Sequence, residues 1–267
     1  GATITNSGTA TGFGSADPAS ADGDTLGTAS LEWSDLYLAD SGVIYFGNDQ
    51  DITLTHVPDT GLILGGTTPT LTIGDAGEED TKIVFDGNAQ DFHIGLDDTA
   101  DSLTIGLGSA LGTTSHMVFD AAGHITQPLQ SAFCAYLGSD QTNWSLYAAR
   151  TVAFDTERFD QNADFDTTTY TFTAPVTGRY QLNAMIYIED YQGDANMYQY
   201  AFNTSNEVYS WYDLGGRSID GSGGGAISML ADMDASDTAV VTVYQHAGAA
   251  TADAKANSCH FSGHLVC

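Results

Sequence analysis

The most regular stretch of the chain runs from Gly178 to Ile188 and reads GRYQLNAMIYI. Its side chains fall into two alternating sets. The first set is Tyr180, Leu182, Ala184, Ile186 and Ile188, and the second is Gln181, Asn183, Met185 and Tyr187. Because successive side chains of a strand point to opposite faces, this alternation predicts a strand with one face in a core.

The residues around this stretch carry similar patterns. From about Gln127 onward aromatic residues become denser, and Gly- and Asp-rich connections separate the apolar runs. We expect ten strands, at Ala132–Leu137, Trp144–Tyr147, Thr151–Phe154, Thr169–Phe172, Arg179–Ile188, Met197–Phe202, Glu207–Tyr212, Ala226–Leu230, Thr238–Gln245 and His260–Val266. Such short strands indicate an all-β sandwich or jelly roll. We call residues 128–267 the head.

Three motifs occur in order within the head. The first is the spacing of Phe154, Asp160, Phe165, Phe172, Gly178 and Tyr180. The second is Asp237–Val240, and the third is the closing run Phe261-Ser262-Gly263-His264-Leu265. Together they resemble the globular head of complement C1q and its tumour necrosis factor-like relatives, although Leu182 and Ala184 stand where aromatic residues are usual. The resemblance implies a ten-stranded jelly roll that forms homotrimers, with both termini at its base and a binding apex opposite.

A different pattern occupies the chain from Val43 to Thr126. Short apolar runs alternate with Asp-, Gly- and Asn-rich turns, and a Thr-Ile-Gly to Val-Phe-Asp pattern recurs after 32 to 34 residues. The expected strands begin at Val43, Ile52, Leu62, Leu71, Lys82, Phe92, Leu103 and Met117. Strands this short cannot enclose a core in one copy, so we expect a repetitive β-stalk in which three copies wind together. A monomeric β-solenoid is the alternative.

Two segments of this region carry a second resemblance. The runs Gly27–Leu38 with Gly42–Asp51, and Thr81–Phe92, are similar to repeat segments in tail fibres of marine tailed bacteriophages. The resemblance implies a modular virion fibre without chemistry of its own. We therefore assign residues 27–127 to the stalk. Residues 1–26 are interpreted as a flexible lead-in or upstream stalk, and the absence of an initial Met suggests a piece of a longer protein.

The charge balance excludes several classes of partner. Asp and Glu number 35 against 6 Lys and Arg, which gives a net charge of -29. A surface of this sign repels phosphate backbones, so we expect no nucleic-acid binding. No apolar run reaches the length of a membrane span, so we expect no membrane insertion. Such a charge requires salt or bound cations to screen self-repulsion.

The segment from Tyr209 to Gly225 is expected to be the most interesting loop of the head. The C1q resemblance implies a calcium-binding aspartate at the apex before a glycine-rich strand, which corresponds to Asp213, with Asp220 near a second ligand position. Carboxylates suit calcium, which takes six to eight oxygen ligands. Stacking area and hydrogen-bond donors for a receptor are expected from Tyr209, Trp211, Tyr212 and Arg217. A solvated loop without a ligand is the alternative.

The remaining reactive residues fit no motif. Cys134, Cys259 and Cys267 match no zinc spacing, and Cys134 could form a disulfide with at most one of the others. We interpret them as buried, chemically idle thiols. The stalk histidines, His56, His93, His116 and His124, are interpreted as ordinary surface residues, and the alternative is that they point at the threefold axis of the stalk.

These patterns favour binding over catalysis. The chain contains no zinc-protease, nucleophile-elbow or phosphate-loop motif, so we expect no enzyme. The leading hypothesis is a trimeric phage tail fibre, located in the virion tail, whose head binds a glycan or protein on the host surface. Its upstream stalk would contact other tail proteins. The alternatives are a structural subunit of an extracellular filament or cell-surface appendage and, third, a polysaccharide depolymerase.

Overall fold

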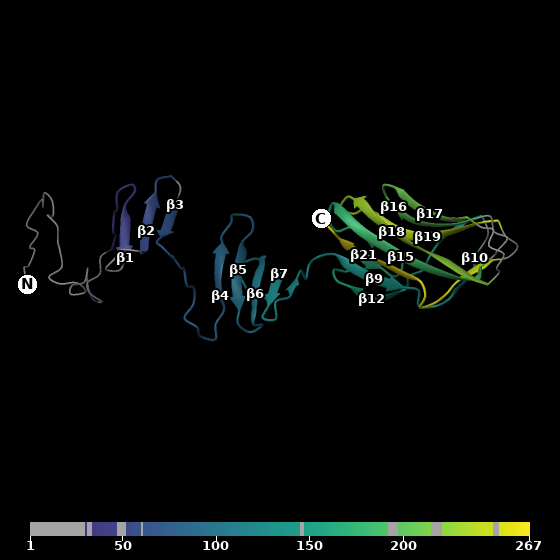
Figure 1. Cartoon of the computed structure of the whole chain (residues 1–267), viewed down its shortest axis with the longest axis horizontal. Coiled ribbons are helices and arrows are strands. Elements are labelled where there is room, and N and C mark those ends of the chain that lie inside the picture. The colour runs from purple at the N-terminus through teal and green to yellow at the C-terminus, as the bar shows by residue number, and fades with distance from the viewer. Residues whose placement is uncertain are drawn as a thin grey trace, which may run out of the picture. The chain divides into compact units, whose positions relative to one another are not determined.

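The computed structural model describes residues 30, 34–46, 52–59, 61–144, 147–191, 197–214, 221–247 and 251–267. It divides into two compact units, Gly1–Thr72 and Ile73–Cys267. In the residues that the structure describes, all regular structure is β, as predicted (Figure 1). Within these described ranges, no helix is long and apolar enough to cross a membrane.

The first unit contains one antiparallel sheet of three strands. Its strands are β1 (Val43–Phe46), β2 (Ile52–Val57) and β3 (Gly61–Gly65), in that order. All three were predicted from their short apolar runs. Each is bounded by turn-forming residues, which limits its length.

The second unit begins with a five-stranded antiparallel sheet in sequence order. Its strands are β4 (Thr81–Phe85), β5 (Phe92–Asp97), β6 (Ser102–Leu107), β7 (Ser115–Asp120) and β8 (Ile125–Thr126). The strand predicted from Leu71 is wrong, because residues 71–74 are not part of a strand. Leu71 and Ile73 are 71% and 44% exposed and precede β4 outside the sheet. A short apolar run becomes a strand only where a neighbour pairs with it.

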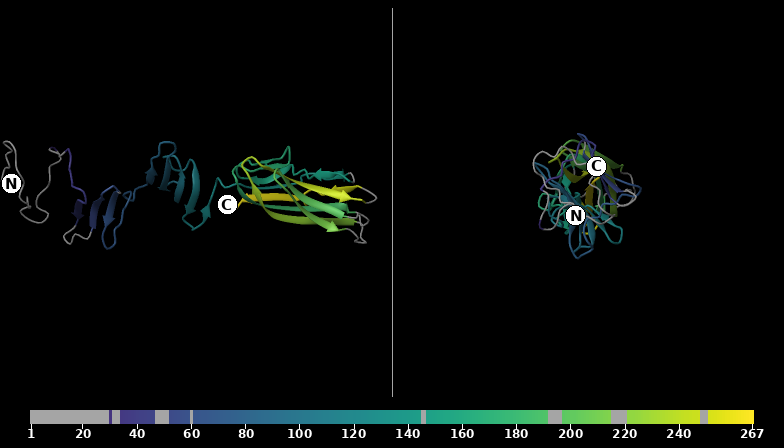
Figure 2. Two further views of the ribbon diagram at one scale, coloured as in Figure 1. Left: turned by 90° about the horizontal axis from the view of Figure 1, so that it is seen from above. Right: turned by 90° about the vertical axis from the view of Figure 1, so that its left-hand side faces the viewer.

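The head consists of two packed sheets (Figures 1 and 2). The first has the order β10-β20-β15-β21-β9-β12, with β18 on β15, and the second has the order β13-β14-β19-β16-β17, with β11 on β19. The strands are β9 (Ala132–Tyr136), β10 (Gln141–Trp144), β11 (Ala149–Thr151), β12 (Thr156–Asp160), β13 (Phe165–Asp166), β14 (Thr171–Thr173), β15 (Gly178–Tyr191), β16 (Met197–Thr204), β17 (Val208–Leu214), β18 (Gly221–Met233), β19 (Thr238–His246), β20 (Ala252–Ala254) and β21 (His260–Leu265). The jelly roll is confirmed.

Some strand predictions in the head were wrong in position or number. The strand expected at Trp144–Tyr147 ends at Trp144, and the one expected at Thr151–Phe154 instead ends at Thr151. The strands β12, β13 and β20 were not predicted. Their sequences, TERFD, FD and ADA, lack a row of large apolar side chains, and they form because β9, β14, β10 and β15 pair with them.

The alternating stretch from Gly178 forms the centre of the first sheet, as β15. Its inward side chains are buried, and Tyr180, Leu182 and Ile188 have no exposed surface. They meet a group of phenylalanines in which the ring of Phe133 stacks on Phe165 and Phe172 at 5.0 and 4.8 Å. Phe261 packs edge-on against Phe133 at 4.9 Å. These aromatic contacts make the apolar residues of the motif spacing the core of the domain.

The other motif residues shape the backbone. Asp160 accepts hydrogen bonds from the backbone N–H groups of Asp164 and Phe165 at 3.1 and 2.8 Å, so its carboxylate closes the turn between β12 and β13. At Gly263, an added Cβ would lie 2.8 Å from both Leu182 and Phe133. Only glycine leaves room there for the core to close.

The two ends of the head lie close together, at the end where Cys267 is marked in Figure 1. The N–H of Leu265 donates to the carbonyl of Ser131 at 3.0 Å. The N–H of Arg179 donates to the carbonyl of Cys267 at 2.8 Å. Both ends of the head are thus fixed at one end of the barrel. The opposite end holds the contact between Tyr191 and Asp213, and the candidate groove lies along the middle of the barrel.

Candidate binding site in the head

The two sheets are joined near the far end of the barrel by a tyrosine and a carboxylate. Tyr191 ends β15 in the first sheet, and its hydroxyl donates to Oδ2 of Asp213 in β17 of the second sheet at 2.7 Å. The ring of Tyr191 stacks on Tyr198 of β16 at 4.2 Å. Both tyrosines are buried, and Asp213 is 7% exposed. This cluster holds the two sheets at a set separation.

The strand predicted at Glu207–Tyr212 is present as β17, whereas the glycine run before Ala226, which was predicted as part of a loop, opens the strand β18. Residues 209–214 lie in β17, and residues 221–225 open β18. A Cβ at Gly223 would lie 2.3 Å from the ring of Tyr191, and one at Gly225 would lie 2.6 Å from the ring of Trp211. The glycines allow aromatic rings to pack directly on the backbone of β18, which no larger residue permits.

A cavity of about 280 Å³ opens between the edge strands of the two sheets. It is lined by Phe202, Tyr209, Ser210, Trp211, Ala226, Ile227, Ser228 and Met229. The ring of Trp211 packs on Tyr200 at 5.4 Å and is 41% exposed, so one side of the indole faces the core and the other faces solvent. We call this cavity, between β17 and β18, the edge groove.

The residues predicted to bind a ligand are divided by the structure. Tyr209 and Trp211 line the edge groove, whereas Tyr212 points to the opposite face of β17 and is 47% exposed. Arg217 lies outside the described residues. Successive side chains of a strand point to opposite faces, so Trp211 and Tyr212 cannot line the same groove. A loop would not have imposed this separation.

The predicted calcium ligands are also in different situations. Asp213 is directed at Tyr191, within the cluster that joins the sheets. Asp220 lies outside the described residues. Within the described ranges, no group of three His, Cys, Asp or Glu side chains is arranged to hold a metal ion. The calcium site stays a prediction, with Asp213 as its one described ligand.

A second hollow, of about 530 Å³, lies on the outer face of the first sheet. It follows the bare backbone of Gly223–Gly225 and is bordered by Met185, Tyr187 and His260. Burial, with Arg158 nearby, lowers the pKa of His260, so the imidazole is neutral at pH 7. This surface was not predicted from the sequence, although the glycine run indicates a strip of backbone without side chains.

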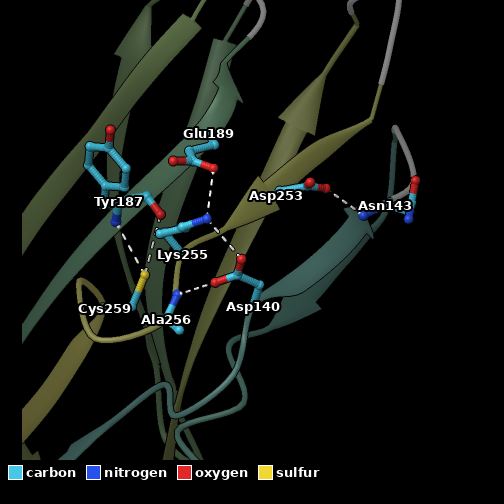
Figure 3. Close-up of polar contacts among 8 residues, drawn as sticks. All are labelled: Asp140, Asn143, Tyr187, Glu189, Asp253, Lys255, Ala256 and Cys259. Carbon is cyan, nitrogen blue, oxygen red and sulfur yellow. Dashed lines mark hydrogen bonds and ion pairs between the residues drawn. The ribbon is translucent and has the colours of Figure 1, made fainter.

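One of the six cationic side chains fixes the segments beside this hollow (Figure 3). Nζ of Lys255 donates to Oδ2 of Asp140 at 2.9 Å and to Oε2 of Glu189 at 3.0 Å. These bonds hold the pKa of Lys255 above its ordinary value. Asp140 also accepts a hydrogen bond from the N–H of Ala256 at 2.8 Å, and this bond, with that of Lys255, lowers the pKa of Asp140.

The three thiols differ in burial: Cys259 is buried and Cys134 is partly buried, whereas Cys267 is exposed, so the prediction of a buried thiol is wrong for Cys267. Cys134, Cys259 and Cys267 are all free, so no disulfide forms. Cys259 is buried, and its Sγ lies 3.3 Å from the backbone nitrogen of Tyr187. Burial raises the pKa of the Cys259 thiol and of the Cys134 thiol, which keeps both protonated and unreactive at neutral pH.

Residues 132–266 match the model of the C1q domain, and this segment is just over half of the 267 residues. The chain belongs to the C1q domain family. Two solved structures are similar to the C1q domain. The globular domain of zebrafish complement 1qA protein is 19% identical, covers 51% of this chain and 98% of its own, and has a TM-score of 0.38. Eiger TNF from S. frugiperda is 13% identical, covers 52% and 93%, and has a TM-score of 0.38.

A comparison with curated proteins finds no match. Proteins of the C1q family are generally non-enzymatic and typically extracellular, and C1q and tumour necrosis factor domains usually form homotrimers. The edge groove and the outer hollow are therefore surfaces of a domain whose family works through binding.

Proposed function

We propose that this protein is a homotrimeric extracellular adhesin whose C1q domain recognises a glycan or protein on a cell surface. The observation that carries the proposal is the edge groove, a concave surface with a half-exposed tryptophan on a domain of a binding family. An indole face stacks well on the apolar face of a sugar ring or on a hydrophobic side chain. Three heads on one assembly would add avidity.

The proposed setting is a bacteriophage tail fibre. The support is the resemblance of residues 27–127 to fibre repeats, together with a series of small β-sheets that precedes the domain. In this setting the upstream stalk joins the other tail proteins, and the head contacts the host. The high negative charge keeps copies of the protein from associating unspecifically.

The first experiment measures the mass of the full chain by light scattering. A trimer gives three times the 28.0 kDa of one chain. A mass of 28.0 kDa at micromolar concentration would exclude the homotrimer.

The second experiment tests adhesion with two matched variants. The labelled trimeric protein should coat candidate host cells and block phage adsorption, and Trp211→Ala should weaken both effects at least tenfold. Tyr212→Ala, which removes an aromatic side chain from the opposite face of the same strand, should leave them unchanged.

The two readouts separate the possible roles of the edge groove. If Trp211→Ala turns the trimer into monomers, the groove is a subunit contact and not the receptor site. If a correctly trimeric wild-type protein binds no host cell, the adhesin proposal is wrong. If the protein binds cells but has no effect on phage adsorption, the adhesin proposal stands and the proposal of a phage tail fibre is wrong.

A further inference from the structure

The sheet of β4 to β8 has an unusual distribution of exposed side chains. Antiparallel pairing places three apolar rows on one face. The rows are Phe85–Phe92–Leu107, then Ile83–Ile94–Ile105–Met117, and then Leu96–Leu103–Phe119–Ile125. We call these residues the apolar face. Phe85, Ile94 and Ile125 are 56%, 37% and 59% exposed, so solvent reaches the most hydrophobic surface of this sheet.

The middle of the opposite face of the same sheet is polar and buried, whereas Val84 of the edge strand β4 is 36% exposed there. His93, Ser102 and Thr104 are 0%, 4% and 2% exposed, so the interpretation of His93 as a surface histidine is wrong. The segment 108–114 crosses this face: the carbonyl of Thr114 accepts from the N–H of Leu107 at 3.0 Å, and a Cβ at Gly95 would lie 2.9 Å from the side chain of Leu111. Nδ1 of His93 donates to the carbonyl of Gly108 at 2.8 Å. The chain thus covers its polar face with its own loop.

This distribution is the reverse of what a monomeric sheet requires. A soluble sheet normally buries its apolar face and exposes its polar one, because removing apolar surface from water stabilises the fold. A continuous exposed apolar surface that extends over several strands marks a contact with another molecule. The partner must be apolar on the contacting side and must reach the sheet in register with its rows.

The neighbouring segment indicates which partner this is. Residues 127–131 connect β8 to β9, and the head holds them by side-chain hydrogen bonds. Nε2 of Gln161 donates to the carbonyls of Gln127 and Gln130 at 2.9 and 2.7 Å, and Nδ2 of Asn162 donates to that of Leu129 at 2.8 Å. A trimer of heads would therefore bring three copies of β8 close together, at a high effective concentration.

We propose that the apolar face is the contact by which three copies of the β4–β8 sheet pack around one axis, each sheet forming one side of a three-sided prism. This inference rests on the proposed homotrimer and assigns the stalk its own interface. In the prism each apolar row meets its own counterparts, while the loop-covered face of His93 lies outside.

The distribution of charge supports a second copy as the occupant. Copies with a net charge of -29 repel one another, and this repulsion is weakest where the contacting surfaces carry no charge of their own. Apart from Thr81, which pairs with Leu96 at the end of one row, this face of the sheet consists of Ile, Leu, Met and Phe, and the acidic residues nearby, such as Asp98 and Asp101, lie in the connections between strands. The contact can therefore form without bringing carboxylates together.

The sheet of the first unit carries the same kind of row. Ile44, Leu54 and Leu64 pair across β1, β2 and β3, and Leu64 is 36% exposed. Tyr45 and Ile63, on the other face of this sheet, are 58% and 54% exposed, so the first unit has exposed apolar residues on both faces.

A photo-crosslinking experiment on the full chain tests the proposal. Benzoylphenylalanine replaces either Ile94, on the apolar face, or Val84, which is equally exposed at 36% but pairs with His93 and so lies on the opposite face. Irradiation should join copies through position 94 into dimers and trimers on a denaturing gel, with the linked peptides mapping to residues 81–126 of another copy. Position 84 should give at least tenfold less product.

Light scattering on the same samples separates this proposal from the homotrimer itself. A trimeric mass with no product from position 94, or with product that maps to the head, overturns the stalk interface and leaves the trimer standing. A monomeric mass overturns both. Equal crosslinking from positions 94 and 84 also overturns the proposal, because it shows contact without a preferred face.

Discussion

The hydroxyl of Tyr191 donates to Oδ2 of Asp213 at 2.7 Å, and this bond joins the last residue of β15 to an edge strand of the opposite sheet. The ring of the same tyrosine occupies the space over Gly223, where a Cβ would lie 2.3 Å away. One aromatic side chain thus connects three strands at the end of the barrel beside the edge groove.

Removing the hydroxyl should therefore weaken the head. Tyr191→Phe leaves the ring in place but removes the donor to a buried carboxylate, and we expect a loss of about 1–3 kcal/mol in the free energy of unfolding. Urea denaturation at a fixed protein concentration measures it. Tyr212→Phe, on the exposed face of β17, is the control and should change stability by less than about 0.5 kcal/mol. Equal losses in the two variants would show that the bond between Tyr191 and Asp213 contributes no more to stability than an exposed hydroxyl.

The glycine run should not tolerate a methyl group. Gly225→Ala places a Cβ 2.6 Å from the ring of Trp211 and 3.0 Å from that of Tyr200. Forcing extra volume into a packed site costs roughly 1–3 kcal/mol. Thermal melting and the fluorescence of Trp211 should both change. Ser222→Ala, in an exposed position of the same run, should alter neither, and an unaffected Gly225→Ala protein would contradict the packing described.

The phenylalanine cluster should dominate the stability of the head. Phe261→Ala removes a fully buried ring that contacts Phe133, Phe154, Phe165 and Phe202. Deletions of this kind cost about 3–5 kcal/mol. Phe159→Ala, at a residue 53% exposed on β12, should cost clearly less in the same urea titration. Comparable losses would mean that the core lies elsewhere.

The ion pairs around Lys255 should make part of the stability depend on pH. The N–H of Ala256 and the ammonium of Lys255 lower the pKa of Asp140, so folding favours the ionised carboxylate. That contribution is complete above the pKa of an unfolded aspartate, about 3.9, and is lost as the pH falls through the lower folded pKa. Asp140→Asn should thus lower the melting temperature at pH 7 but have little effect below about pH 3.

The control for this experiment is Glu157→Gln, which neutralises an exposed carboxylate of β12. Its effect on melting should be small at both pH values. High salt should reduce the effect of Asp140→Asn, because the pair with Lys255 is partly exposed. A difference between the wild type and Asp140→Asn that does not vary with pH would show that the charge of Asp140 is not involved.

The calcium prediction is tested by melting the full chain in excess calcium and in a chelator. An ion that binds only the folded protein adds about 2.7 kcal/mol at a concentration one hundred times its dissociation constant. We expect calcium to raise the melting temperature of the wild type and to raise it less in Asp213→Asn or Asp220→Asn. An unchanged midpoint, or an equal rise in both variants, would remove these residues as ligands.

Much of the head could be predicted because its signals are local or are separated by regular intervals. Tyr180, Leu182 and Ile188 alternate with polar neighbours. Because the side chains of a strand alternate between its two faces, this pattern predicts that the three residues are buried on one face. The motif residues Phe165, Phe172 and Phe261 are likewise core residues. The edge groove was predicted only in part, because the interval from Tyr209 to Gly225 was interpreted as one loop although it contains parts of two strands from different sheets.

The sequence by itself determined that the protein is all-β, that residues 178–188 form a central strand and that the stalk consists of short apolar strands. Those features depend on the alternation of side chains and on turn residues, which act over a few positions. Only the tertiary structure decided that Tyr191 reaches Asp213, that Gly223–Gly225 lie beneath aromatic rings and that His93 is buried while Ile94 is exposed. These outcomes depend on which distant strands become neighbours and on which face a loop covers. Two adjacent residues such as His93 and Ile94 cannot reveal that choice, because alternation separates the two faces but does not say which is buried.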